Sequence, residues 1–350
     1  GLVGSEMCIR DSLKTNRKTE MTKPKLSFWQ IWNLSFGFLG VQIGYSLQNS
    51  NTSSIFESLG ADVSHLSYFW LAAPLAGMIV QPIVGLFSDG TWTRWGRRIP
   101  YILGGSLIST LALVLMPNCP KLLAFAPLAM GAFILLFMDL SFNVTMQPFR
   151  ALVADMLDDS QKTQGYVVQT FLINLGAVVG AILPLVMTWL GVSDEAAPGH
   201  VSPHIAYSYY AGGAILLLTV LVTSFKTREY PPGEFARYNN LSEEDAKPMS
   251  FVGLMRNVPG VMVRLGVTQF FSWAALFLMW TYLKPAITGV VTDHATGEVL
   301  SAGATQTWVG VLNGTYPIPA CIAALFLGRV AARYGNKPVY AACLLAGALG

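Results

Sequence analysis

The sequence predicts an all-α membrane protein, and three observations support this fold class. Of the 350 residues, 53% are hydrophobic and only 12% are charged, which is about half the charged fraction of an ordinary soluble domain. The mean hydropathy is positive, at +0.49. Long charge-free runs also recur along the chain, and each can hold a helix of roughly 20 apolar residues, the length that crosses about 30 Å of hydrocarbon.

The positions of the charged residues predict eight complete membrane spans. Six of them occupy charge-free runs, which lie between Lys25 and Glu57, Asp62 and Asp89, Arg98 and Lys121, Lys162 and Asp194, Glu195 and Lys226, and Glu298 and Arg329. The other two carry internal charges. One runs from about residue 122 to 145 around Asp139, and the other from about 258 to 287 around Arg264 and Lys284.

Both ends of the sequence carry expectations of their own. The last apolar segment, PVYAACLLAGALG, has thirteen residues, too few to cross a bilayer, so we expect a ninth helix that is cut and a C-terminally truncated fragment. The opening GLVGSEMCIRDS lacks the apolar core of a signal peptide and resembles translated sequencing adaptor. We expect residues 1–20 to be a non-native or disordered tail and Met21 to be the true start.

Lysine and arginine fall almost entirely on one side of the predicted topology. With a cytoplasmic N-terminus, only Lys121 and Lys284 lie outside, as expected because positive residues are retained on the cytoplasmic side. We therefore expect a multi-pass protein of the cell or plasma membrane, monomeric, in contact with the lipid bilayer and with no nucleic-acid partner. The histidines fall in outer loops, where solvated side chains are favoured over a pH sensor. The cysteines show no metal or redox spacing, so we expect no metal and no cofactor.

A charged segment divides the chain into two halves. KTREYPPGEFARYNNLSEEDAK carries nine charges in 22 residues and a Pro-Pro pair, a composition typical of a cytoplasmic linker. We expect an N-terminal six-helix bundle over 21–225, a linker over 226–255 and an incomplete C-terminal bundle over 256–350. RWGRRIPY, from Arg94, and RYGNKPVY, from Arg333, stand at the same place in each half. The halves therefore read as repeats, and a complete chain is expected to have twelve helices.

The loop after the second span carries the most specific motif. A glycine, three residues, an acid and an Arg-x-Gly-Arg-Arg run resemble the signature loop of the major facilitator superfamily. Its residues here are Gly85, Asp89, Arg94, Gly96, Arg97 and Arg98, with GTWT inserted before Arg94. The inserted form is similar to the disaccharide branch (glycoside-pentoside-hexuronide type) that contains plant sucrose–proton symporters, their animal relatives and bacterial maltose-type carriers. The resemblance covers roughly Pro24 to the end, and it implies a major facilitator fold with alternating access.

This motif suits a gate between two helix bundles. Asp89 stands at the cytoplasmic end of its helix, where it can pair with arginine and hydrogen-bond to a facing helix terminus, and the glycines permit close backbone approach. A positive-inside anchor explains Arg97 and Arg98 equally well. The second copy has Ala332 in place of the acid and Asn336 in place of one arginine, which weakens the case for a gate there.

Polar residues in the fourth span predict a buried functional face. Asp139, Asn143 and Gln147 are spaced by four, so they lie on nearly one face of a helix, turned to a polar interior. An ionised Asp that faced lipid would cost about 2.5–3.5 kcal/mol. Such a carboxyl can bind and release a proton as its surroundings alternate between wet and dry. The alternative is that Asp139 only ties helices together by hydrogen bonds.

Arg150 stands eleven residues after Asp139, about 16 Å along an ideal helix, so a direct pair between them is excluded. Asp155 or an incoming helix terminus is the nearer candidate partner. The fourth helix of the sucrose carriers has the same pattern, which here is Asp139, Asn143, Pro148, Arg150, Ala151 and Asp155. The resemblance implies proton coupling at Asp139 with Arg150, and it places Asp155 with the gating motif.

Amides and aromatics recur on the predicted helices, as a sugar site requires. Amides offer paired donor and acceptor groups to hydroxyls, and aromatic faces cover the apolar side of a pyranose ring. The candidate substrate-binding residues are Gln42, Tyr45, Asn49, Asn143, Gln169, Gln269, Trp273 and Asn313. Few acids accompany them, which favours a neutral polyhydroxy substrate. Single positions such as Trp280, Tyr316 and Asn174 are equally explained as interfacial aromatics or interhelical contacts.

The predicted function is therefore a sugar–proton symporter for a disaccharide such as sucrose or maltose. A sodium-coupled glycoside symporter would present several acids on the second and fourth helices, and the second has none before Asp89. An uncoupled sugar facilitator needs no buried Asp139, and a multidrug exporter would have a larger apolar cavity and fewer amides. A membrane-embedded enzyme needs a metal cluster or a nucleophile with its base, and the predicted core has no histidine. A structural or receptor role predicts binding without flux.

Overall fold

The computed structural model describes residues 22–60, 72–195, 199–239, 253, 258–287, 297, 308–309, 311–312 and 314–349. Helices make up nearly all of this described part, and its only β feature is an isolated bridge between Thr93 and Gly96. The predicted all-α class is confirmed.

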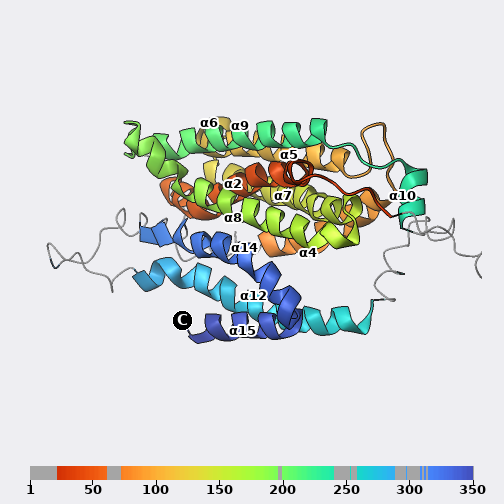
Figure 1. Cartoon of the computed structure of the whole chain (residues 1–350). Coiled ribbons are helices and arrows are strands. Elements are labelled where there is room, and N and C mark those ends of the chain that lie inside the picture. The colour runs from red at the N-terminus through yellow and green to blue at the C-terminus, as the bar shows by residue number, and fades with distance from the viewer. Residues whose placement is uncertain are drawn as a thin grey trace, which may run out of the picture.

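The described helices follow the predicted order of spans (Figure 1). The N-terminal set is α2 (Phe28–Ser58), α4 (Ala72–Gly90), α5 (Ile99–Leu115), the short η2 (Met116–Asn118) and α6 (Cys119–Leu122), α7 (Pro127–Met156), α8 (Asp159–Trp189) and α9 (Pro203–Lys226). The later helices are α10 (Pro232–Tyr238), α12 (Gly260–Ile287), α14 (Pro317–Tyr334) and α15 (Asn336–Leu349).

Four of the described helical segments are long and apolar enough to cross a membrane. They are Ile99–Leu122, Pro127–Met156, Asp159–Trp189 and Pro203–Lys226. These correspond to the predicted third, fourth, fifth and sixth spans. The long helix α2 stands outside this group, and amides such as Gln42, Gln48 and Asn51 lower its hydropathy.

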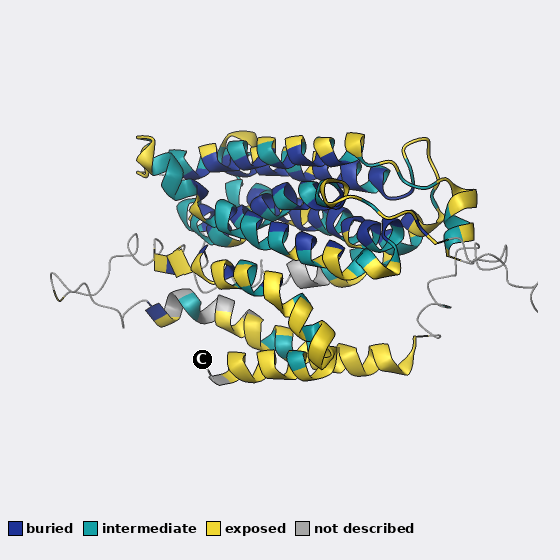
Figure 2. Cartoon of the chain, in the orientation of Figure 1, coloured by how far each residue is buried: buried dark blue, intermediate teal, exposed yellow. Residues whose placement is uncertain are grey.

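The N-terminal helices form one bundle with a continuous core. Helix α2 packs on α8 and α9, α5 packs on α7 and α9, and α4 packs on α7, while α14 lies against α8. Figure 2 shows the buried faces of the bundle turned inward, and α12, α14 and α15 largely exposed. Small residues set the spacing of α2 and α8, because a Cβ on Gly176 or Gly180 would lie 2.5 or 2.6 Å from a carbonyl oxygen of α2.

Local sequence explains where two of these helices begin. Ser27 caps α2 by accepting from the Gln30 N–H, while the Gln30 side chain accepts from the Ser27 N–H at 2.8 Å, a reciprocal capping box. Asp158 caps α8 by accepting from the Ser160 N–H at 3.1 Å. Both caps satisfy backbone donors that have no partner within the helix.

The fourth span is longer than the sequence predicts. Helix α7 begins at Pro127 and continues past Thr145 to Met156, although Pro148 lies inside it. Neighbouring helices and local adjustments make such prolines tolerable in membrane helices. One continuous helix therefore carries Asp139, Asn143, Arg150 and Asp155.

Candidate functional site

A cluster of charges joins three helices at the end of the bundle where α10 lies (Figure 1). Arg98, at the N-cap of α5, donates Nε to Asp155 Oδ2 of α7 at 2.9 Å and Nη1 to Ser88 Oγ at 2.5 Å, and its Nη2 lies 2.5 Å from Asp89 Oδ1 of α4. Arg97 Nη2 lies 2.5 Å from the same Asp155 oxygen. Both arginines are buried, at 7% and 5% exposure for Arg97 and Arg98, so their partners are needed to offset desolvation.

Glu229 completes this cluster, and sequence reasoning missed it. It follows α9 in the charged linker, and its carboxylate accepts from the backbone N–H groups of Arg97, Arg98 and Ile99 at 3.0, 2.8 and 2.9 Å. These are donors at the start of α5, which an anion suits. Burial raises the pKa of Glu229 above its ordinary value, and the three N–H bonds oppose that rise. No spacing distinguishes Glu229 among the nine linker charges.

Gly96 makes room for that carboxylate. Its φ is +113°, in the region that favours glycine, and a Cβ there would lie 2.5 Å from Glu229 Oε1. Gly85 differs from the expectation of close backbone approach, because a Cβ there would meet nothing within 4 Å in the described part of the chain. Gly335, in the second copy of the motif, also has a positive φ of +87°, as the equivalent Gly96 does.

The linker is more than a spacer between the halves. The guanidinium of Arg97 lies 4.1 Å from the ring centroid of Phe235 on α10, a cation–π distance. The Tyr230 hydroxyl donates to the Met156 carbonyl at 3.3 Å, at the end of α7. Arg94 is exposed and lies over the Trp95 ring at 5.5 Å instead of joining the ion pairs. The segment from Glu229 to Phe235 therefore docks on the signature loop.

Asp139 lies inside the bundle, paired with an amide. The carboxylate is 2% exposed, and its Oδ1 accepts from Gln48 Nε2 of α2, a residue that is fully buried. Sequence reasoning missed Gln48 because it is six residues after Gln42, off the face that Gln42, Tyr45 and Asn49 define. Gln48 lies in the polar stretch SLQNSNTSS, and nothing in the sequence distinguishes it from the neighbouring amides Asn49 and Asn51.

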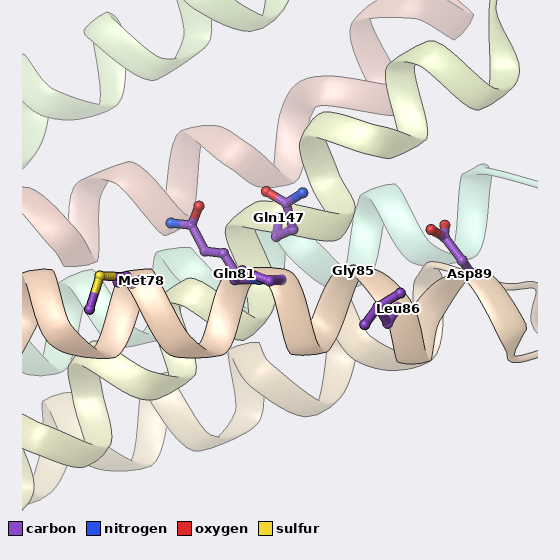
Figure 3. A pocket seen from close by; sticks show the side chains of 8 residues that line it. Met78, Gln81, Gly85, Leu86, Asp89 and Gln147 are labelled. Carbon is purple, nitrogen blue, oxygen red and sulfur yellow. The ribbon is translucent and has the colours of Figure 1, made fainter. Parts of the chain in front are cut away.

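Asn143 extends the polar face toward a groove between α4 and α7. Asn143 Oδ1 accepts from Gln81 Nε2 at 2.6 Å, and Asn143 Nδ2 donates to the Asp139 carbonyl at 2.8 Å. The groove has a volume of about 470 Å³ and runs along α4 from Gly77 to Asp89, with Gln147 opposite (Figure 3). This volume is within the range of small-molecule sites, about 300–1,000 Å³. Gln81 is a second residue that sequence reasoning missed.

Tyr45 and Asn49 form a separate polar pair on α2. The Tyr45 hydroxyl is hydrogen-bonded to the Asn49 side chain, and the Tyr45 ring meets Phe142 of α7 edge-on at 5.8 Å. Arg150 interacts electrostatically with Tyr45, is exposed, and forms none of the ion pairs found among the described residues. The expected partnership of Arg150 with Asp155 is therefore wrong in this conformation, because Asp155 is held by Arg97 and Arg98.

The other candidate sugar residues are less closely grouped. Gln169 is 3% exposed and donates to the Phe149 carbonyl at 3.2 Å, a contact that joins α8 to α7. Gln42 is half-buried next to Gly176 of α8. On α12, Gln269 is half-buried and Trp273 is 57% exposed. Asn313 lies outside the described residues.

These features together define the class of protein to which the chain belongs. A helical bundle with membrane-length apolar helices, a buried acid among amides and an ion-pair cluster at one end is a multi-pass membrane transport protein. The model of the MFS/sugar transport protein family matches residues 55–350. The chain belongs to this family, whose members are transport proteins and not enzymes, as the sequence predicts.

Several curated proteins are similar to the chain. The general alpha-glucoside permease of Schizosaccharomyces pombe is 25% identical over 293 residues, covering 78% of this chain and 50% of the permease. Sucrose transport protein SUT1 of Oryza sativa subsp. japonica is 27% identical over 267 residues, with 68% and 49% covered. Sucrose transport protein SUT5 of Oryza sativa subsp. indica is 25% identical over 321 residues, with 82% and 57% covered. The chain thus spans about half the length of these relatives.

Proposed function

We propose that the protein is a secondary active transporter that moves a neutral sugar together with protons by alternating access. The substrate is a disaccharide such as sucrose or maltose, in keeping with the sucrose and alpha-glucoside carriers among its relatives. Asp139 takes up a proton from outside, the sugar binds beside it, the bundles rock, and both are released inside. The observation that carries this proposal is a carboxylate at 2% exposure inside a helix bundle, with an amide as its partner.

The burial of Asp139 argues that its carboxyl group has a function in transport. An ionised carboxylate is expensive at membrane depth, and residues of this kind mark substrate and proton pathways by default. A purely structural tie between α2 and α7 would be served by a neutral Asn at lower cost. The recurrence of amides around Asp139, at Gln48, Gln81, Asn143 and Gln147, suits hydroxyl groups of a sugar better than a charged metabolite.

We assign roles to the remaining sites on the same basis. Gln81 and Gln147 line the groove, and with Asn143, which is hydrogen-bonded to Gln81, they are the first sugar contacts. Tyr45 and Asn49 are a second group. The contacts of Asp89, Arg97, Arg98, Asp155 and Glu229 form the cytoplasmic gate, which must break and reform as the bundles move. Arg150 lies eleven residues after Asp139 on the same helix, so we assign it an influence on the proton site through Tyr45 and not a direct pair with Asp139.

The topology that accompanies this function has eight spans and part of a ninth within this sequence, and twelve in the complete protein. We place the N-terminus and the charge cluster in the cytoplasm and the protein, as a monomer, in the plasma membrane. The support is the positive-inside pattern of Lys and Arg. The six-helix N-terminal unit, the linker and the C-terminal unit keep the boundaries that the sequence predicts.

Uptake of labelled sucrose and maltose into vesicles tests the proposal, with the protein expressed from its full natural coding sequence. Accumulation should require an inward proton gradient and persist when sodium is replaced by choline. Asp139→Asn should abolish accumulation while exchange of sugar at equal pH continues. Asp159→Asn is the matched control, because Asp159 lies 91% exposed in a surface pair with Lys162. Sodium-dependent accumulation would favour the sodium-coupled alternative, and gradient-independent equilibration the facilitator.

A further inference from the structure

The contact between Gln48 and Asp139 leaves two buried atoms without partners. Gln48 Nε2 donates to Asp139 Oδ1, yet Gln48 Oε1 and Asp139 Oδ2 are buried and have no hydrogen-bond partner among the described residues. An ionised carboxylate only accepts hydrogen bonds, so the amide must turn its nitrogen to it. Its own oxygen is then left over. Orphaned buried acceptors are rare in native proteins, and each requires an explanation.

A single proton supplies a partner to both orphaned atoms. When Oδ2 of Asp139 is protonated, the acid gains one O–H donor, and the free acceptor on the same partner is Gln48 Oε1. A carboxylic acid and a primary amide then join by two antiparallel hydrogen bonds, N–H to Oδ1 and O–H to Oε1. The ionised state keeps the first bond only. The pair is therefore incomplete without the proton and complete with it.

We propose that Gln48 is a positioning residue for Asp139. Protonation of Asp139 changes the number of hydrogen bonds between the two side chains, and with it the strength of the contact between α2 and α7. This inference rests on the proposed function and names the residue through which its coupling acts. Protonated, the acid–amide pair holds the two helices by two hydrogen bonds; deprotonated, it holds them by one. The proton that enters with the sugar thus tightens α2 against α7, and its release loosens them.

The surroundings of the pair support a local device of this kind. The backbone of α2 is fixed at this point, because Thr52 Oγ1 donates to the Gln48 carbonyl at 2.6 Å and the Tyr209 hydroxyl donates to the Leu47 carbonyl at 3.2 Å. Phe142, three residues from Asp139 on α7, meets Tyr45 edge-on. This ring contact includes neither of the atoms that the proton changes, so in the proposed device the polar pair alone responds to the proton.

Few titratable groups compete with Gln48 for the carboxylate. Tyr45 interacts electrostatically with Asp139, and Arg150 with Tyr45. Asp89 and Asp155 are held by arginines in the end cluster. The helices packed against α7 also carry Glu57, Tyr101, Cys119, Lys121, Asp159, Lys162 and Tyr166. Among the described residues, the Gln48 amide is the one side chain that donates to the Asp139 carboxylate.

The test compares the pH dependence of sugar uptake in the full-length protein with that of Gln48→Met and Gln48→Glu. Gln48→Met keeps the volume but removes two hydrogen bonds from the protonated acid and only one from the ionised acid, so the proton is held less tightly and the pH of half-maximal uptake should fall by about one unit. In Gln48→Glu, two carboxyl groups share one proton and hold it tightly. Sugar exchange at equal pH should continue there, while gradient-driven accumulation is lost.

Asn51→Met is the matched control, since Asn51 is a buried amide one turn away that donates only to the Leu47 carbonyl among the described residues. It should leave the pH of half-maximal uptake unchanged. A Gln48→Met profile that coincides with that of Asn51→Met would overturn the proposal.

Infrared difference spectra give a readout that does not depend on transport. The band of the protonated carboxyl group, assigned by its loss in Asp139→Asn, should move when Gln48 is replaced and stay in place in Asn51→Met. A band unmoved by Gln48→Met also overturns the inference. If wild-type uptake is independent of pH, the proposed function fails instead, and the infrared band still decides whether Gln48 and Asp139 form the pair.

Discussion

Arg98 Nε donates to Asp155 Oδ2 at 2.9 Å, and this contact joins the first residue before α5 to the last turn of α7. The guanidinium of Arg98 also reaches Asp89 and Ser88 on α4. One planar side chain therefore holds three helices at the end of the bundle, and each contact uses a different nitrogen. A gate that opens here must break all three contacts together.

Replacing Arg98 by Lys should not preserve this junction. A lysine keeps the charge but offers one ammonium group instead of a planar fork, so it cannot reach Asp155, Asp89 and Ser88 at once. We expect a loss of about 1.5–3 kcal/mol for each charged contact that is not remade, seen as a lower thermal unfolding temperature of the purified protein. Asp155→Asn should lower it too, and the double variant should lose less than the two single losses added, because the residues share a contact. Strict additivity would argue against the junction.

Gly96→Ala should undock Glu229 from the start of α5. The new methyl would lie 2.5 Å from the carboxylate, at a φ of +113° that other residues rarely adopt. We expect a cost of about 1–3 kcal/mol from backbone strain alone, measured by thermal unfolding, and a higher rate of proteolysis in the linker.

Gly104→Ala is the control for this change. Gly104 lies within α5, and a Cβ there meets nothing within 4 Å among the described residues. Ala in place of a helical Gly should be neutral or stabilising by up to about 1 kcal/mol. Equal losses of thermal stability in Gly96→Ala and Gly104→Ala would mean that the contact of Glu229 with the start of α5 does not contribute to stability.

Glu229→Ala should destabilise the protein and remove part of its pH dependence. The change leaves three backbone N–H groups of α5 without their acceptor, a loss comparable to that of a helix cap, about 0.5–2 kcal/mol. Burial raises the pKa of Glu229 from its ordinary 4.5, so the folded protein holds that proton more tightly than the unfolded chain does. The stability that this adds is complete below pH 4.5 and is lost as the pH rises through the folded pKa.

Acidification from neutral pH toward 4.5 should therefore add stability to the wild type that Glu229→Ala does not gain. The measurement is the unfolding temperature against pH for both proteins. Glu234→Ala, an exposed acid on α10 a few residues further on, is the control and should follow the wild-type curve. The assignment fails if Glu229→Ala and the wild type show parallel curves.

Asn143→Ala should separate sugar binding from proton coupling. Asn143 accepts at 2.6 Å from Gln81, which lines the groove, while Asp139 accepts from a different amide, Gln48 of α2. We expect the KM for sugar to rise about tenfold, as for the loss of one or two hydrogen bonds, while accumulation remains dependent on the proton gradient. Gln81→Ala should behave alike. Uptake kinetics with an unchanged KM in both variants would remove Asn143 from the sugar site.

The sequence is sufficient to predict the most repetitive features of this protein. Helical runs of apolar residues are local properties, so the all-α class and the membrane setting follow from composition and charge spacing. The buried face of α7 follows as well, because Asp139, Asn143 and Gln147 are spaced by four in one helix. The pairing of Asp89 with arginine is within reach too, since the acid and Arg98 flank one short loop.

Contacts between distant parts of the chain were beyond sequence reasoning. The sequence suggested Asp155 as a partner of Arg150, which is five residues away on the same helix. In the fold, Asp155 instead pairs with Arg97 and Arg98, at the start of another helix. Gln48, Gln81 and Glu229 acquire their roles only through partners at least 60 residues away. A single amide or acid in a sequence carries no mark of such a partner.

The sequence by itself determined that the chain forms apolar helices and buries a carboxylate on α7, because each of these depends on neighbours within a few turns. Only the tertiary structure decided that Gln48 meets that carboxylate and that Glu229 docks on α5. Those contacts depend on how closely the glycines let α2, α8 and α9 approach one another. They also depend on where the linker brings Glu229 against the start of α5. Helix packing, a non-local sum of many weak contacts, sets both.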